Sequence, residues 1–165
     1  MSLCLERKSV RKFKSTPISD TVITELLKSA MQAPSAKNQQ PWRFFVIKNQ
    51  DLLKQLSKVS TGAHMVEHAP IAIVVGFTND TKSPKMAPTD CAAATQNILL
   101  EVVNQNLGAV WIGLYPLEER TSQVKSLLKL DETITPFSMI AIGEPNESTA
   151  VTKLRYDASK IKVIE

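Results

Sequence analysis

The chain has 165 residues, 43% of them apolar, which suits one domain with a buried core spanning residues 1–165 and is too short for two ordinary domains. No run of eighteen apolar residues occurs, and charges are scattered through the first thirty positions, which excludes a membrane span and argues against a signal peptide. We therefore expect a soluble, cytoplasmic protein with no membrane partner.

The net charge of +4 is concentrated near the start of the chain. Residues 1–50 hold nine Lys or Arg and three acidic residues, a balance of +6, whereas the remainder holds eleven and thirteen, a balance of −2. Five of the cations lie between Arg7 and Lys14. Because so short a basic segment matches one or two phosphates better than a duplex backbone, we expect no nucleic-acid partner. A solvated N-terminal arm is the alternative interpretation.

Apolar periodicity predicts alternating helices and strands. The first long helix, 20–33, begins after Ser19, a good N-cap, and ends before Pro34. The elements that follow are a strand at 42–48, a short helix at 52–59, a strand at 69–77, a helix at 89–107, a strand at 108–116, a helix around Val124 and a strand at 137–145. Residues 78–88 have no periodicity and contain two prolines, which predicts a loop near an opening or a surface linker. This alternation predicts a layered sheet with helices on its faces.

Two segments point to contacts beyond one chain. The helix at 89–107 is apolar on more than one face near its middle, which is typical of a central helix or of a subunit contact. The last twenty residues contain one apolar patch, IKVI, and too little else to form an independent unit. We expect this tail to dock on another surface, with a partner subunit as the candidate.

Several kinds of site are disfavoured by the residues present. The five glycines form neither GxGxxG nor GxxxxGK[ST], so a bound phosphate would depend on side chains such as arginine. His64 and His68 are four residues apart and could share a helical face, but no third ligand is evident and we expect no metal site. Cys4 and Cys91 form no CxxC pair, and Cys91 lies in an apolar run, as a small buried hydrophobe would.

The remaining candidates are polar residues in the N-terminal segment, in one loop and in the tail. The N-terminal candidates are Arg7, Lys8, Ser9 and Arg11. Their cationic donors and hydroxyl suit a phosphate and a polar ring edge. Ser35 and Asn38, in a proline-bounded loop, suit the carbonyl and imide groups of a flat ring. Lys153 and Arg155 could close on the same anion, so the set describes an anionic, planar ligand with a polar edge.

Three segments resemble, in this order, the nitroreductase family of FMN-dependent oxidoreductases in its smaller-subunit form. They are ERKSVRKFKSTPIS (6–19), APSAKNQQPWRFFVI (33–47) and DCAAATQNILLEVVNQNLGAVWIG (90–113). The resemblance implies an α+β flavin fold, with a central mixed sheet flanked by helices in three α/β/α layers. It also implies a homodimer with tightly bound FMN at the subunit interface. Electrons would pass by a ping-pong mechanism from NADH or NADPH through FMN to nitro compounds, quinones or similar small acceptors.

The resemblance also implies residue roles around the phosphate and the ribityl chain. Arg7 and Arg155 would grip the phosphate, with Lys153 nearby. The ribityl chain and the pyrimidine edge of the ring would be lined by Lys8, Ser9 and Arg11. Arg11 would be the cation near N1 and O2, where reduction places negative charge.

Further residues would surround the flavin ring. Those from the partner subunit would be Pro34, Ser35, Ala36 and Asn38. Passing behind the ring would be Ile112, Gly113 and Leu114, with a backbone N–H directed at N5. No side-chain acid or base would be catalytic, because the flavin carries the chemistry.

Two alternatives stay open beside this hypothesis. Relatives with the same fold dehalogenate substrates or fragment flavin, which requires a substrate lid, and 78–88 is the loop that could serve as one. The other alternative is a flavin-binding protein without turnover.

Overall fold

The computed structural model describes residues 2–147 and 154–165. Its centre is a four-stranded sheet in the order β1-β2-β4-β3. The strands are β1 (Trp42–Ile47), β2 (Ile71–Thr78), β3 (Gly108–Gly113) and β4 (Ile134–Gly143). Each neighbouring pair is antiparallel. The α+β class is confirmed, but the sheet is antiparallel where a mixed sheet was expected.

The insertion of β4 explains this difference in the sheet. Strands β2 and β3 are joined through a helix, and each pairs antiparallel with β4, so the two run in the same direction. They are not neighbours, because β4 lies between them. Among the described residues, the parallel pairing that the structure records is a single bridge between Ser9 and Ala109.

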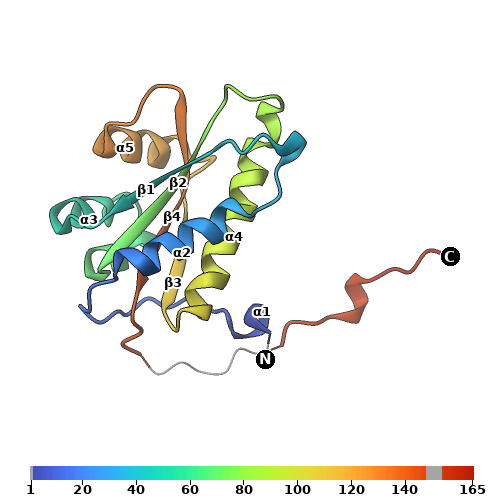
Figure 1. The fold of residues 1–165 in the computed structure, drawn as a ribbon, viewed down its shortest axis with the longest axis horizontal. Coiled ribbons are helices and arrows are strands. Elements are labelled where there is room, and N and C mark those ends of the chain that lie inside the picture. Colours follow the sequence, from blue (N-terminus) through green and yellow to red (C-terminus); the bar gives the residue numbers. More distant parts are fainter. Residues whose placement is uncertain (1, 148–153) are drawn as a thin grey trace.

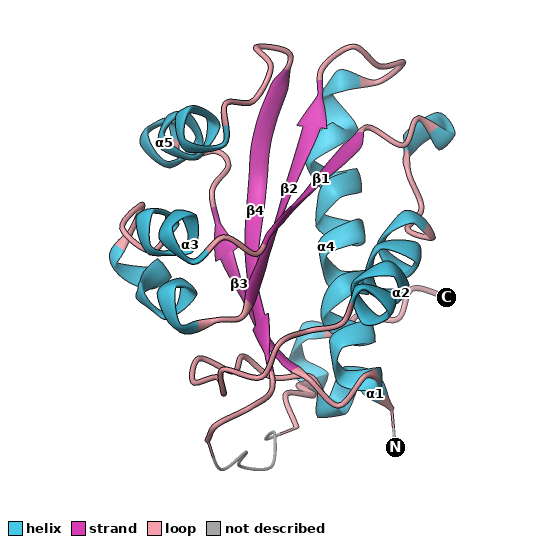
Figure 2. Cartoon of the chain, turned by 60° about the vertical axis from the view of Figure 1, so that its left-hand side comes forward, coloured by secondary structure: helices cyan, strands magenta, loops and turns pink. Residues whose placement is uncertain are grey.

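Helices cover both faces of the sheet (Figure 2). One face carries α3 (Gln50–Leu56), α5 (Glu118–Leu128) and a 3₁₀ segment, Thr61–His68, that the periodicity did not predict. The other carries α2 (Asp20–Met31) and α4 (Ala87–Asn104). The expected three layers are therefore confirmed.

The strand sequences are apolar on both faces because each face has its own core. In β4, Met139 and Ala141 belong to the core beneath α3 and α5, whereas Ile140 and Ile142 belong to the core beneath α2 and α4. This alternation follows the two-residue period of a strand. Burial on both faces is why these strands read as continuous apolar runs.

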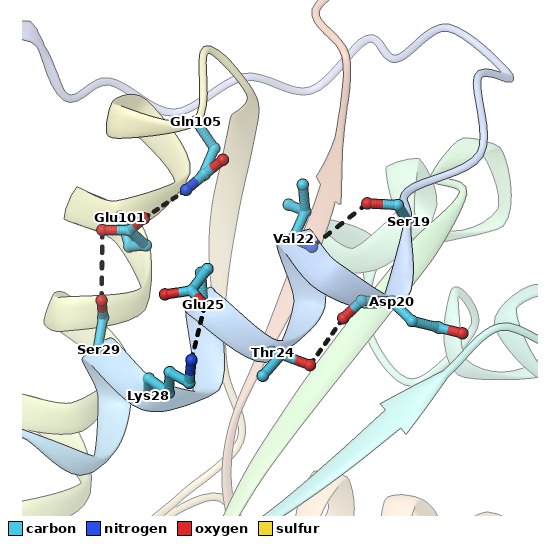
Figure 3. Close-up of polar contacts among 9 residues, drawn as sticks. All are labelled: Ser19, Asp20, Val22, Thr24, Glu25, Lys28, Ser29, Glu101 and Gln105. Carbon is cyan, nitrogen blue, oxygen red and sulfur yellow. Dashed lines mark hydrogen bonds and ion pairs between the residues drawn. The ribbon is translucent and has the colours of Figure 1, made fainter.

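Helices α2 and α4 are joined by packing and by polar contacts (Figure 3). Ser19 caps α2 as expected, its Oγ accepting the Val22 N–H at 3.3 Å. Ser29 on α2 donates to Glu101 on α4 at 3.3 Å, and Gln105 donates to the same carboxylate at 2.7 Å. Helix α4 also packs on all four strands, which makes it the central helix of this layer.

Several segments differ in detail from the expected elements. The predicted loop 78–88 contains a 3₁₀ turn, Pro84–Met86, and its last two residues already belong to α4. His64 and His68 lie on the 3₁₀ segment, where three residues make a turn, so a spacing of four does not align their side chains. A short helix α1 (Leu3–Glu6) precedes Arg7. No helix in the described part of the chain is long and apolar enough to cross a membrane.

Candidate functional site

The N-terminal segment after α1 lies along the edge strand β3. The Val10 N–H donates to the Ala109 carbonyl at 2.9 Å. Gly108 allows this approach, since a Cβ at that position would stand 2.7 Å from Val10 Cβ. The sheet edge thereby anchors the segment that carries Arg7, Lys8 and Ser9.

The same segment continues along the chain that leaves β4. The Lys14 N–H donates to the Glu144 carbonyl at 2.9 Å, and the Arg11 N–H donates to Glu147 Oε1 at 3.0 Å. The side chains of Lys14 and Thr16 donate to the Glu144 carboxylate, and these hydrogen bonds lower the pKa of Glu144. The backbone of Arg11 is therefore held, while the residue itself is exposed.

Residues from both ends of the chain line one pocket of about 670 Å³. Its cationic residues are Arg7, Lys8 and Arg155. Glu6 also lines the pocket, and apolar residues supply most of its walls, among them Leu5, Leu99, Val102, Val103, Leu107 and Leu154. The fold thus brings together Arg7 and Arg155, the two predicted phosphate ligands. Lys153 falls outside the described residues.

The loop at 34–40 lies beside the start of α4, at the opposite end of that helix from the pocket (Figure 1). The Ala36 N–H donates at 3.0 Å to Asp90, in the first turn of α4, whereas Val103, near the end of that helix, lines the pocket. These two α4 residues are thirteen positions apart, which at about 1.5 Å per residue is about 20 Å. Within one chain, Pro34, Ser35, Ala36 and Asn38 are therefore remote from the pocket that Arg7 lines.

At the end of β3, a ligand could meet backbone N–H and C=O groups, because the neighbouring side chains are buried. Ile112 and Leu114 are buried in the core beneath α3 and α5. The Leu114 N–H donates toward β4, to the Phe137 carbonyl at 3.1 Å. Because N–H groups alternate in direction along an antiparallel strand, Gly113 directs its N–H and C=O to the open edge. Arg120 occupies this edge, donating from Nη1 to the Gly113 carbonyl at 3.0 Å.

Cys91 is buried against β2, as the sequence predicted. Its side chain is 0% exposed, and its Sγ lies 3.5 Å from the Gly76 carbonyl oxygen. Burial, with a smaller contribution from the charge of Asp90, raises the pKa of the thiol to about 12. A thiol in this state is not a nucleophile near neutral pH. Among the described residues, no group of three or more His, Cys, Asp or Glu side chains is arranged to hold a metal ion.

Sequence reasoning missed three residues near these positions: Gln39, Asp90 and Arg120. Asp90 had a visible signal, because a carboxylate beside Cys91 stands at the head of an apolar helix and must be satisfied if it is buried. Gln39 and Arg120 had none, since their partners lie far away in the sequence and only the fold brings them near.

The chain is similar to known proteins over nearly all of its length. A sequence model of the nitroreductase family matches residues 4–64 and 60–144. A protein from Archaeoglobus fulgidus, provisionally named NADH dehydrogenase/NAD(P)H nitroreductase, is 41% identical over 89% of this chain and 88% of its own. A protein of the same provisional name from Methanothermobacter thermautotrophicus is 37% identical, with 94% and 81% covered.

Solved structures share the fold. A protein from Clostridium acetobutylicum, provisionally named NADH oxidase, superposes with a TM-score of 0.96 at 39% identity, covering 99% of each chain. A provisionally named nitroreductase from Desulfovibrio desulfuricans, solved in complex with FMN, has a TM-score of 0.83 at 28% identity, covering 99% of this chain and 94% of its own.

Proposed function

The chain belongs to the nitroreductase family, and we propose that it holds FMN and passes electrons from NADH or NADPH to nitro compounds, quinones or similar small acceptors in alternating half-reactions. The names of the archaeal relatives support the nicotinamide donor. The FMN bound in the Desulfovibrio structure supports the cofactor.

The observation that carries this proposal is the convergence of Arg7, Lys8 and Arg155 on one pocket. These residues come from opposite ends of the chain, so their meeting is a property of the fold and not of a local basic run. Forked cationic donors suit a phosphate, and a chain without a glycine phosphate loop needs such side chains to hold one. The residues present therefore fit the phosphate of FMN.

When bound, FMN supplies the electron-carrying ring, so the protein has to bind, orient and polarise the reactants. Arg11 would provide positive charge near N1, where it stabilises negative charge that develops on reduction. Of the predicted residues 112–114, Gly113 is the one with an outward N–H, and this group would serve the N5 edge. The nicotinamide donor and the acceptor would bind in turn over the same exposed face of the flavin ring. The protein would position them, and no side-chain acid or base would be needed.

We place the FMN at the interface of a homodimer. Because Arg11 and Asn38 would both have to reach one flavin ring, and their segments lie at opposite ends of α4, a second chain would bring the 34–40 loop to the site. The tail supports an interface as well, since it extends away from the domain (Figure 1). Its exposed apolar residues are Leu154, Tyr156, Ile161, Val163 and Ile164. We propose that this tail docks on the partner subunit.

Anaerobic spectroscopy tests the catalytic part of this proposal. We expect the protein to take up FMN tightly, to bleach with NADH or NADPH in the absence of air, and to recover its colour on addition of a nitro compound or a quinone. A protein that takes up FMN but does not bleach would be a flavin-binding protein without turnover. Failure to take up FMN would count against the whole proposal.

Sedimentation tests the shared site independently. Because a ligand that binds the dimer preferentially stabilises it by mass action, FMN should raise the dimer fraction at low protein concentration. A monomer with full FMN occupancy would contradict the shared site while leaving the redox function intact. Dehalogenation and flavin fragmentation stay alternatives on the same fold, and the cytoplasmic location stays a prediction.

A further inference from the structure

Asp90 is a buried carboxylate that serves a loop outside its own helix. It is 5% exposed. Its Oδ1 accepts a hydrogen bond from the Ala36 N–H at 3.0 Å, and its Oδ2 accepts one from Gln39 Nε2 at 2.6 Å. Its position in the first turn of α4 favours negative charge. Burial of a carboxylate is costly without such donors, so these two hydrogen bonds are what keeps Asp90 inside.

Gln39 extends the contact to a third segment. Its Nε2 also donates to the Ser83 carbonyl at 3.1 Å, and its Oε1 accepts the Ser83 N–H at 2.8 Å. One amide therefore joins α4, the 34–40 loop and the loop at 79–86. These contacts determine the orientation of the Gln39 amide. If Oε1 and Nε2 changed places, Nε2 would face the Ser83 N–H and two donors would meet.

The backbone between these contacts is in an uncommon conformation. The φ angles are 53° at Lys37, 51° at Asn38 and 46° at Gln40. Left-handed backbone is unfavourable for residues other than glycine, and least so for asparagine and aspartate. Such residues persist where the surrounding structure holds them. The hydrogen bonds of Asp90 to Ala36 and Gln39 bracket Lys37 and Asn38, and so hold this part of the loop.

We propose that Asp90 is a positioning residue for the flavin site. It holds the backbone from Ala36 to Gln39 in the conformation that presents Ser35 and Asn38, and through Gln39 it ties that conformation to the loop at 79–86. Asp90 does not touch the cofactor. The role rests on the proposed function, in which the 34–40 loop contacts FMN. It also makes the loop at 79–86 a support of the site and not a freely opening lid.

A reciprocal exchange of amide and carboxylate tests this role. In Asp90→Asn, the new amide nitrogen faces Gln39 Nε2, and two donors meet. In Gln39→Glu, two carboxylates meet and the Ser83 carbonyl loses its donor. In the double variant, the residue 90 amide donates to a residue 39 carboxylate, which reverses the native direction but restores one donor and one acceptor. The residue 39 carboxylate still accepts the Ser83 N–H, while the Ser83 carbonyl stays without its native donor. The double variant also has the net charge of the native chain.

Glu101→Gln is the matched control. Glu101 lies on the same helix and accepts hydrogen bonds from Ser29 and Gln105 (Figure 3). The change has the same carboxylate-to-amide chemistry as Asp90→Asn but lies away from the 34–40 loop. Circular dichroism on all four variants establishes that they are folded.

Two measurements separate positioning from general stability. In FMN-free protein, hydrogen exchange of the Ser83 amide should speed up at least about tenfold in each single variant, because its acceptor is displaced. In reconstituted protein, each single variant should bind FMN about tenfold more weakly and change the visible dichroism of the flavin. The double variant should recover both to within about threefold, whereas Glu101→Gln should change neither.

The outcomes distinguish this role from the proposed function. Single variants with faster Ser83 exchange but native FMN affinity and flavin spectrum would overturn the role of Asp90, with the function intact. Strictly additive effects in the double variant would likewise overturn the direct coupling of Asp90 to Gln39. If the native protein binds no FMN, the proposed function fails. The exchange measurement then still reports whether Asp90 holds the loop.

Discussion

Two glycines decide whether the N-terminal segment can lie against the sheet. A Cβ at Gly108 would stand 2.7 Å from Val10 Cβ, and one at Gly143 would stand 3.0 Å from Phe13 Cβ. Both distances are shorter than ordinary van der Waals contact between carbon atoms. Because the segment between Val10 and Phe13 carries Arg11 and follows Arg7, these glycines help to place the candidate cofactor ligands.

Gly108→Ala should therefore destabilise the protein and weaken FMN binding together. Overpacking of this kind costs about 1–3 kcal/mol of unfolding free energy. Gly62→Ala is the control, since its Cβ would meet only Ser60 Oγ at 3.8 Å, and we expect its effect to stay within about 0.5 kcal/mol. Urea denaturation and FMN titration measure the two effects. Equal stabilities for the two variants would show that the N-terminal segment is not held closely at Gly108.

Arg7→Ala should weaken FMN more than riboflavin. Hydrogen bonds to charged groups contribute about 1.5–3 kcal/mol, so the affinity for FMN should fall by about one to two decades. Riboflavin has no phosphate and should bind poorly to both proteins. Lys12→Ala, which removes an exposed cation outside the pocket, should leave the affinity for FMN unchanged. Isothermal titration measures each affinity, and equal binding of FMN and riboflavin by the native chain would refute this phosphate site.

The Cys91 thiol should make the stability fall with pH in the alkaline range. Burial raises its pKa in the native state from 9.0 to about 12, so the unfolded chain loses its proton first. The contribution is complete below about pH 9 and is lost as the pH rises toward 12, by up to about 1.4 kcal/mol per pH unit. Cys91→Ala should lack this component, which urea denaturation at several pH values would reveal. Parallel pH profiles for the two proteins would contradict the assignment.

At the scale of elements, helix α4 connects the parts of the candidate site. Its first turn holds the 34–40 loop through Asp90, and its last turns line the pocket with Val102 and Val103. Val102 is 1% exposed and belongs to the core of its own chain. Most of the apolar surface of α4 is thus buried within one chain. Less of it remains for contact with a partner subunit than the sequence suggested. A test of the interface should use the half-buried Val103 in place of Val102.

Val103→Glu should lower the dimer fraction and the flavin content together, because a charge would enter the proposed interface next to the pocket. Val102→Glu should instead unfold the chain, since Val102 is 1% exposed and packs in the core. Analytical ultracentrifugation measures the dimer, absorbance measures the flavin, and circular dichroism confirms folding. A folded Val103→Glu protein that stays dimeric with full flavin would exclude this end of α4 from the interface.

At the scale of the whole molecule, the exposed C-terminal tail is a candidate contact in the proposed dimer. In the described part of the tail, residues 154–165, every residue is exposed, and several are large and apolar. Such side chains gain about 25 cal/mol per Å² on leaving water. We propose that these side chains pack against the surface of a second subunit.

Truncation after Arg155 should shift the protein from dimer to monomer while it keeps the predicted phosphate ligand. The melting temperature should then fall and should depend less on protein concentration than that of the full chain. Sedimentation and thermal denaturation at two protein concentrations measure these effects. Ile161→Ser with Val163→Ser in the full-length chain should act in the same direction, which separates the loss of apolar contacts from the loss of chain length. An unchanged dimer after truncation would refute docking of the tail.

The sequence by itself determined most of the elements and the family. Ser19 and the helical repeat after it located α2, and apolar runs located the strands, because periodicity and capping are local properties of the chain. Arg7, Ser35 and Asn38 were recognised as candidates because residue type and order carry the family resemblance.

Only the tertiary structure decided how these pieces combine. Strand order is a long-range property, so the insertion of β4 between β2 and β3, and with it the antiparallel sheet, had no local signal. The same holds for the meeting of Arg7 with Arg155 and for the separation of the 34–40 loop from both by the length of α4. The sequence signalled that Asp90 would need partners but not which ones, because a carboxylate's partners depend on the donors that the fold brings within hydrogen-bonding distance.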